Sequence, residues 1–186
     1  MNSLKNIIFI SIFSILCIFA VVHAGINANN IKMPIEEKTE VLWDVVFEKD
    51  ENTNEIIVDK TENVEYDLPQ LFDSIVNDFN VLFAKNDEEI TFTFYITNKS
   101  EYDSYILHYN KPKLTCLDNE EECSKNLDKI IYTFTYDNGE EVKLNDLIKA
   151  NEKKKVHVKI KYLNADTNIP MNLTKLGFSL TFAKVK

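Results

Sequence analysis

Arginine is absent from the 186-residue chain, so all 21 basic side chains are lysines. The chain therefore has no guanidinium group to bind a phosphate or a carboxylate through two parallel hydrogen bonds. Its net charge is −9, and a negative field repels polyanions. These two features argue against nucleic acid and anionic lipid as partners.

Glycine is nearly as scarce, with three residues, which leaves no glycine-rich loop to cradle a phosphate. Neither an HExxH nor a GxSxG motif is present. Outside the N-terminal segment only two histidines remain: His157 is predicted to be exposed on a strand, and His108 to be partly buried. We therefore predict no catalytic residue, no cofactor-binding residue and no metal ligand, and a protein that is not an enzyme.

Cysteine occurs three times. Cys17 lies inside an apolar N-terminal run, where we expect a membrane-buried thiol rather than a lipidated cysteine. Cys116 and Cys123 are close in sequence and, in an exported chain, predict one disulfide that pins the loop of residues 115–126. The alternative is a metal site formed with the acids between them, but their spacing fits neither a zinc site nor a calcium loop.

An apolar segment opens the chain. In residues 1–24, Lys5 is followed by an apolar run over residues 7–22, which is 16 residues long. That length exceeds a minimal signal-peptide core and falls slightly short of the roughly 20 residues of a comfortable membrane span. Ala24 provides a small residue before Gly25, so the sequence favours cleavage there.

Retention of residues 4–24 as a membrane anchor is the alternative. Both outcomes place the remainder in the extracellular space or at the cell surface, with the membrane contacted only through this segment. Residues 25–40 are polar and read as a linker or N-terminal arm. Residues 41–186 are predicted to form one domain.

Apolar and polar side chains alternate through most of that domain, which is typical of half-buried strands. The pattern is strongest in residues 130–162, where two strands flank a turn at Asn138-Gly139. The predicted inward residues are Ile130, Tyr132, Phe134 and Tyr136 in the first strand and Val156, Val158, Ile160 and Tyr162 in the second. Similar alternation predicts strands at residues 41–47, 55–59, 79–83, 90–97, 104–109 and 176–182.

Other segments lack this period. Apolar residues at helical spacing after Asp67 predict a short helix over residues 69–76, and residues 164–172 are predicted to be a polar connection. Trp43, the only tryptophan, is predicted to anchor the core. The fold class is all-β: an antiparallel β-sandwich, jelly-roll or Ig-like, preceded by an N-terminal hydrophobic export or anchor helix. Its shared interior is predicted to contain Phe92, Phe94, Phe134, Val158 and Phe182.

Two stretches carry a family resemblance: the strand and turn of residues 94–104, and the unit YDNGEEVKLNDLIKANEKKKVHVKIKY of residues 136–162. With the export segment, they resemble the TasA/camelysin-like exported proteins of Gram-positive bacteria. The resemblance implies a small antiparallel sandwich, often a jelly roll. Family members are matrix-fibre subunits or cell-surface proteins, and camelysin itself is described as a metallopeptidase. The chain departs from the family pattern around residues 67–78 and matches no family catalytic residue.

The sequence thus predicts an exported, non-catalytic structural or interaction protein of the cell surface or matrix. Assembly would proceed by β-strand addition, with residues 25–40 as a donor arm. The partner is predicted to be a protein, a cell-surface polymer or a second copy of the chain. The alternatives are a binding module whose loops, including residues 116–123, recognise a surface polymer or protein, and a camelysin-like metallopeptidase.

Overall fold

The computed structural model describes residues 41–42, 44–117, 121–163 and 169–185. The expectations for residues 1–40 and for Trp43 lie outside this part of the chain. The described residues form antiparallel sheets, with one short α-helix, α2 (Glu121–Lys125), and one 3-10 turn, Leu127–Lys129. None of the helices described here is long and apolar enough to span a membrane.

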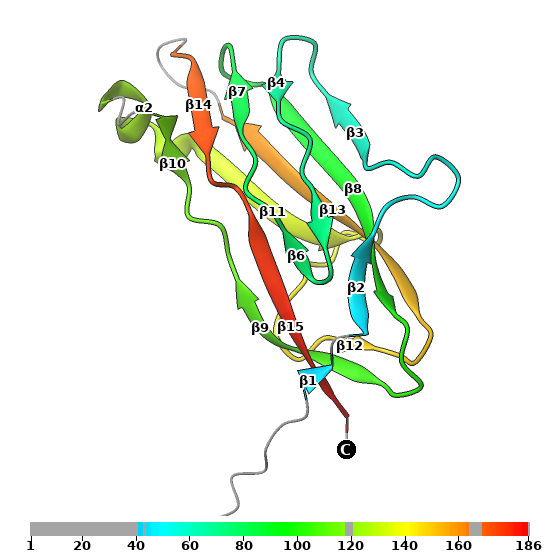
Figure 1. Ribbon diagram of the computed structural model, residues 1–186. Coiled ribbons are helices and arrows are strands. Elements are labelled where there is room, and N and C mark those ends of the chain that lie inside the picture. Colours follow the sequence, from blue (N-terminus) through cyan, green and yellow to red (C-terminus); the bar gives the residue numbers. More distant parts are fainter. Residues whose placement is uncertain (1–40, 43, 118–120, 164–168, 186) are drawn as a thin grey trace, which may run out of the picture. The chain divides into compact units, whose positions relative to one another are not determined.

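One layer is a five-stranded sheet (Figure 1). Its order is β11-β13-β8-β2, and β3 pairs with β8 beyond one end of β2; every pairing is antiparallel. The strands are β2 (Val45–Glu48), β3 (Ile57–Lys60), β8 (Glu89–Asn98), β11 (Ile130–Tyr136) and β13 (Lys153–Tyr162). The long strands β8, β11 and β13 confirm the alternation predicted from the sequence.

The opposite layer contains two sheets. A six-stranded sheet has the order β12-β9-β15-β6-β5, with β1 also pairing β15, and a four-stranded sheet has the order β10-β14-β7-β4. The six strands are β1 (Val41–Leu42), β5 (Leu71–Phe72), β6 (Ile75–Val76), β9 (Ser104–Asn110), β12 (Leu147–Ile148) and β15 (Phe178–Lys184). The four are β4 (Glu65–Tyr66), β7 (Val81–Phe83), β10 (Thr115–Cys116) and β14 (Met171–Thr174).

The two sheets of this layer follow one another along the same chain paths. In Figure 1, β14 (orange) leads directly into β15 (red), and β9 leads into β10. The lateral order β9-β15-β6 in one sheet matches β10-β14-β7 in the other. We call the three connecting segments, residues 77–80, 111–114 and 175–177, the seam.

Aromatic rings join the layers. The ring of Phe178, from the six-stranded sheet, lies 4.9 Å from that of Phe134 and 6.4 Å from that of Phe94, both from the five-stranded sheet. On the four-stranded side, Tyr66 contacts Phe92 at 5.6 Å. Burying one such side chain stabilises the fold by roughly 1.5–3 kcal/mol. The five residues predicted to share one interior are all buried in this single core, which confirms that prediction: Phe92, Phe94, Phe134, Val158 and Phe182.

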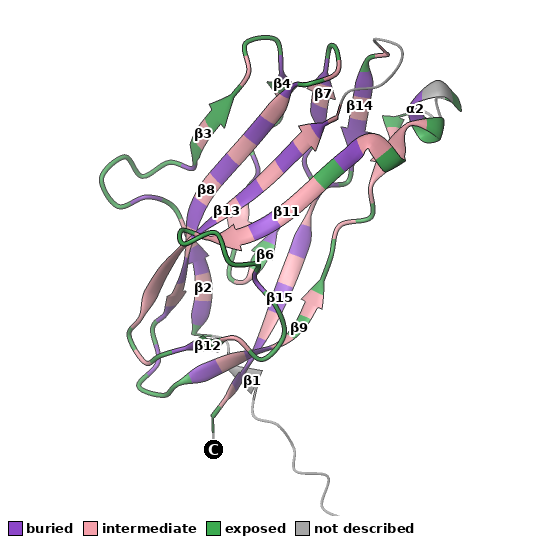
Figure 2. Cartoon of the chain, turned by 180° about the vertical axis from the view of Figure 1, so that it is seen from behind, coloured by how far each residue is buried: buried purple, intermediate pink, exposed green. Residues whose placement is uncertain are grey.

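Burial alternates along β8 and β13, seen in Figure 2 as purple and pink bands. In β9 the alternation is interrupted. Thr181 lies opposite His108, but the next residue, Phe182, lies opposite Ile106, so Leu107 is an extra residue in β9. A bulge of this kind reverses the faces beyond it. His108 is consequently exposed, where the sequence predicts partial burial, and Tyr109 turns toward Phe134 instead.

The helix predicted over residues 69–76 is wrong, because this segment forms the hairpin β5–β6. Asp73 turns the chain with φ of 47°. The N–H of Phe47 donates to the carbonyl of Asp73, and the N–H of Leu180 donates to that of Ser74. Strands from both layers therefore form hydrogen bonds with the backbone of the hairpin. These tertiary hydrogen bonds favour the hairpin over the helix that the spacing of apolar residues predicts.

The predicted polar connection over residues 164–172 is also wrong at its end, since β14 begins at Met171. β14 pairs with β7 on one side and β10 on the other. Met171 and Leu173 are fully buried. Pro170 lies just before the strand, where its missing N–H costs no ladder hydrogen bond.

Candidate functional site

Cys116 and Cys123, the pair that the sequence predicts to be bonded, form a disulfide. Cys116 lies on β10, and Cys123 lies on α2 with its side chain buried in the core. The bond therefore fastens α2 to the edge of the four-stranded sheet. Glu121 pairs with Lys125 one helical turn away, at 2.7 Å. Over the described part of the chain, no group of three or more His, Cys, Asp or Glu side chains is placed to hold a metal ion.

His157 is half-buried on the outer face of the five-stranded sheet, where the sequence predicts an exposed residue. Its Nδ1 lies 2.8 Å from the Thr93 hydroxyl and its Nε2 lies 3.1 Å from the Asp137 carboxylate. Both ring nitrogens are thus engaged by neighbouring side chains. This arrangement ties β13 to β8 and to the turn after β11.

Lysines of β13 cover much of the same outer face. Lys159 contacts Glu89 at 2.9 Å and holds the pKa of that carboxyl below its ordinary value, chiefly through this hydrogen bond. Lys161 lies 3.6 Å from the same carboxylate, and Lys153 pairs with Glu51. Each of these three lysines has an acidic neighbour, with Lys159 and Lys161 sharing Glu89, so acidic side chains offset their positive charge.

Asn98, the last residue of β8, is a buried polar centre. Its carboxamide N–H groups donate to the carbonyls of Tyr102 at 2.8 Å, Lys149 at 3.0 Å and Ile148 at 3.1 Å. Its Oδ1 accepts from the Ser100 N–H and hydroxyl at 3.0 and 2.7 Å. The side chain joins the end of β8 to β12 and is inaccessible to modification in the folded protein.

The edge of the five-stranded sheet at β11 offers open backbone groups. Among the described strands, β11 pairs with β13 alone, and a single bridge links Thr135 to Glu141 on its other side. Near its end, the N–H of Val142 donates to the carbonyl of Phe134, and the N–H of Tyr136 donates to the carbonyl of Glu140, both at 2.9 Å. These bonds lie on the side away from β13. Since alternate residues face the same side of a strand, Tyr132 also directs its N–H and C=O outward.

Among the described residues, nothing pairs with the backbone of Tyr132 on that outer side. β11 has the sequence IIYTFTY, with no charge, proline or glycine. Natural edge strands are commonly protected by lysine, proline or short length. The edge strands β4, β5, β10 and β12 are two residues long, and β3 carries Asp59 and Lys60. β11 lacks each of these protections.

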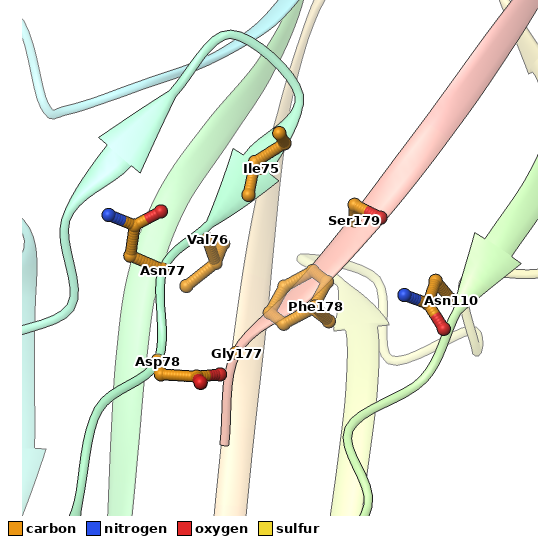
Figure 3. A pocket seen from close by; sticks show the side chains of 8 residues that line it. All are labelled: Ile75, Val76, Asn77, Asp78, Asn110, Gly177, Phe178 and Ser179. Atoms are coloured by element: carbon orange, nitrogen blue, oxygen red, sulfur yellow. The ribbon is translucent and has the colours of Figure 1, made fainter. Parts of the chain in front are cut away.

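A second candidate lies at the seam, where a hollow of about 520 Å³ opens on the layer of the six-stranded sheet (Figure 3). Gly177 permits the chains to approach closely here, because a Cβ on it would lie 2.7 Å from the backbone nitrogen of Asp78. Figure 3 shows the Asn110 carboxamide and the Ser179 hydroxyl directed toward each other, and the Asp78 carboxylate directed toward Gly177. The lining residues are Ile75, Val76, Asn77, Asp78, Asn110, Gly177, Phe178 and Ser179.

No protein-family model, curated protein or solved structure matches the chain. The resemblance to TasA/camelysin-like proteins therefore rests on the sequence stretches quoted for it. The β11 edge and the seam hollow are the two surface features from which a function can be inferred.

Proposed function

We propose that the chain is an exported structural or interaction protein of the cell surface or matrix, without a catalytic role, which assembles by β-strand addition at β11. The observation that carries this proposal is the outward backbone of Tyr132 in an uncharged edge strand. An added strand would gain main-chain hydrogen bonds there and extend the five-stranded sheet.

The proposed donor is residues 25–40 of a second copy. In this segment Ile31, Met33 and Ile35 alternate with Lys32 and Pro34, as a strand with one apolar face requires. Pro34 has no N–H, so in an added strand it would occupy a position that faces away from β11. The proposal includes export through residues 1–24 and a jelly-roll or Ig-like sandwich topology.

Two features support an extracytoplasmic setting. The disulfide between Cys116 and Cys123 is of a kind that persists in oxidising compartments. The apolar N-terminal run provides a route for export. Mass spectrometry of the mature N-terminus in the native host tests this part: a terminus at Gly25 supports release, and an intact Met1 supports anchoring.

Assembly is tested with the chain that begins at Gly25 and with a second chain that begins at residue 41. Electron microscopy and light scattering should show filaments or oligomers of the first and monomers of the second. Monodisperse monomers of both chains over the full concentration range would exclude strand addition by this arm.

A further inference from the structure

We propose that the six-stranded sheet binds a neutral, hydroxyl-rich polymer, a polysaccharide, along a row of outward side chains that ends in the seam hollow. This inference goes beyond strand addition at β11. It uses the other layer of the protein and stands whether or not the chain assembles.

Strand register brings four outward residues into one row. Phe72 lies opposite Ile75 in the hairpin, Ile75 opposite Ser179, and Ser179 opposite Asn110. Directly opposite residues share a face of the sheet. The row crosses β5, β6, β15 and β9, which corresponds to roughly 14 Å at the usual spacing between strands. We call these four residues the outer row.

One end of the outer row is an apolar platform. Phe72 is 54% exposed and Ile75 is 47% exposed, although their hairpin neighbour Val76 is buried. Single exposed apolar residues are ordinary, whereas neighbouring ones form a contiguous apolar patch on which a ligand can pack. The C–H faces of sugar rings pack on such a surface, with an aromatic ring as the flat support.

The other end, at the seam hollow, is polar. Over the described residues, the side chains of Asn77, Asp78, Asn110 and Ser179 make no hydrogen bond or ion pair. Two carboxamides, a hydroxyl and a carboxylate thus offer both donors and acceptors around one hollow. A ligand with many hydroxyl groups, each both donor and acceptor, matches this set.

Another hollow, of about 490 Å³ near the turn after β11, is different. There the Tyr136 hydroxyl donates to Asp146 at 3.0 Å, and the Lys154 ammonium donates to the carbonyl of Leu147 at 2.7 Å. Its polar groups already satisfy one another. Binding there would break these contacts, which favours the seam hollow as the ligand site.

Charge selects a neutral polymer over an anionic one. No lysine lines the seam hollow, and Asp78 is its one ionisable group. The chain as a whole carries −9. A uronic-acid or phosphate-bearing polymer would meet repulsion from both. It would find no cation among the residues that line the hollow, because the nearest lysines in sequence, Lys111 and Lys175, lie in the seam but not in that lining.

The test uses the chain from Gly25 to Lys186 in affinity electrophoresis and calorimetry with laminarin, hydroxyethyl cellulose and glycol chitin, and with polygalacturonate as the anionic comparison. At least one neutral polymer should bind. Phe72→Ala and Asn110→Ala should each weaken binding by about tenfold, the size expected for one lost stacking or hydrogen-bond contact. The matched controls Leu144→Ala and Asn52→Ala change exposed residues outside the row and should bind as the parent does.

Several outcomes overturn the proposal: no binding to any of the three neutral polymers, unchanged binding by both row variants, or tighter binding to polygalacturonate. Self-association that Phe72→Ala abolishes would assign the row to a protein interface and overturn it too. Ile131→Glu, on the β11 edge, should leave polymer binding unchanged. A failure of strand addition is thereby separated from a failure of this site.

Discussion

At the scale of single residues, the side chain of Asn98 makes hydrogen bonds to backbone groups that lack a partner strand. β8 ends at this residue, and the turn to β9 lies against β12 with several carbonyl groups directed inward. A buried carbonyl without a partner is costly. The Asn98 carboxamide supplies the donors for these groups and accepts from Ser100 at the same time.

Asn98→Ala should therefore lower the free energy of unfolding by roughly 3 kcal/mol, because several buried groups lose their partner at once. Asn98→Asp should cost at least as much, since a carboxylate would face carbonyl oxygens. Urea unfolding measures both. Asn52→Ala, an exposed loop change, should stay within about 0.5 kcal/mol, and an equally small effect of Asn98→Ala would refute the role assigned to Asn98.

Gly177 is a second single-residue determinant. Gly177→Ala would bring a methyl group against the backbone of residues 77 and 78, at 2.8 and 2.7 Å. The seam would have to open, at a cost of about 1–3 kcal/mol. Ser179→Ala, two residues further on, removes only an unpaired hydroxyl and should be close to neutral. Equal unfolding midpoints for the two variants in urea would contradict the close approach at Gly177.

At the scale of elements, the strands with a strict period of two were predictable. In β8, and in β13 from Val156 onward, every second residue is buried, so the sequence pattern and the burial agree. The hairpin β5–β6 was not predictable from the sequence. Leu68, Phe72 and Ile75 fall at helical spacing with Val76, which indicates a buried helix face, and yet these three residues are exposed. Spacing alone does not tell a helix face from a hairpin whose backbone is fixed by other strands.

The candidate sites are less readable from sequence than the strands. The sequence identifies β11 as a strand, but its place at an edge depends on which segments pair with β13. The seam hollow forms at the seam, where residues 77–80, 111–114 and 175–177 interrupt three neighbouring strand paths. These three segments are distant from one another in sequence. The one residue in the local sequence that indicates this close approach is Gly177, because the chain has only three glycines.

The disulfide gives the test at this scale. Cys116 and Cys123 close a short loop between β10 and α2. Reducing the bond should lower the free energy of unfolding by about 2–3 kcal/mol, through the greater freedom of the unfolded chain. Urea unfolding with and without reductant measures the effect, and a Cys116→Ala/Cys123→Ala variant should not respond to reductant. Unchanged stability of a chain whose thiols are shown to be free would contradict it.

At the scale of the whole molecule, each of the two layers carries one of the proposed activities: strand addition at the five-stranded sheet and polymer binding at the six-stranded sheet. The five-stranded sheet presents a face with lysine–carboxylate pairs and one open edge, and the six-stranded sheet presents the outer row and the seam hollow. Aromatic contacts such as that of Phe134 with Phe178 hold the layers together. A change on one surface should therefore leave the other intact, provided that this core is kept.

The most direct measurement of the central claim is the mass distribution by light scattering, across a dilution series, of the chain from Gly25 to Lys186 and its Ile131→Glu variant. Ile131 is 42% exposed and lies opposite Lys161, so the new carboxylate has a cation beside it and places a charge on the β11 edge. We predict oligomers for the parent chain and for the control Leu144→Glu, and monomers for Ile131→Glu. Oligomers that persist unchanged in Ile131→Glu, or a parent chain that is monomeric at every concentration, would contradict assembly at β11.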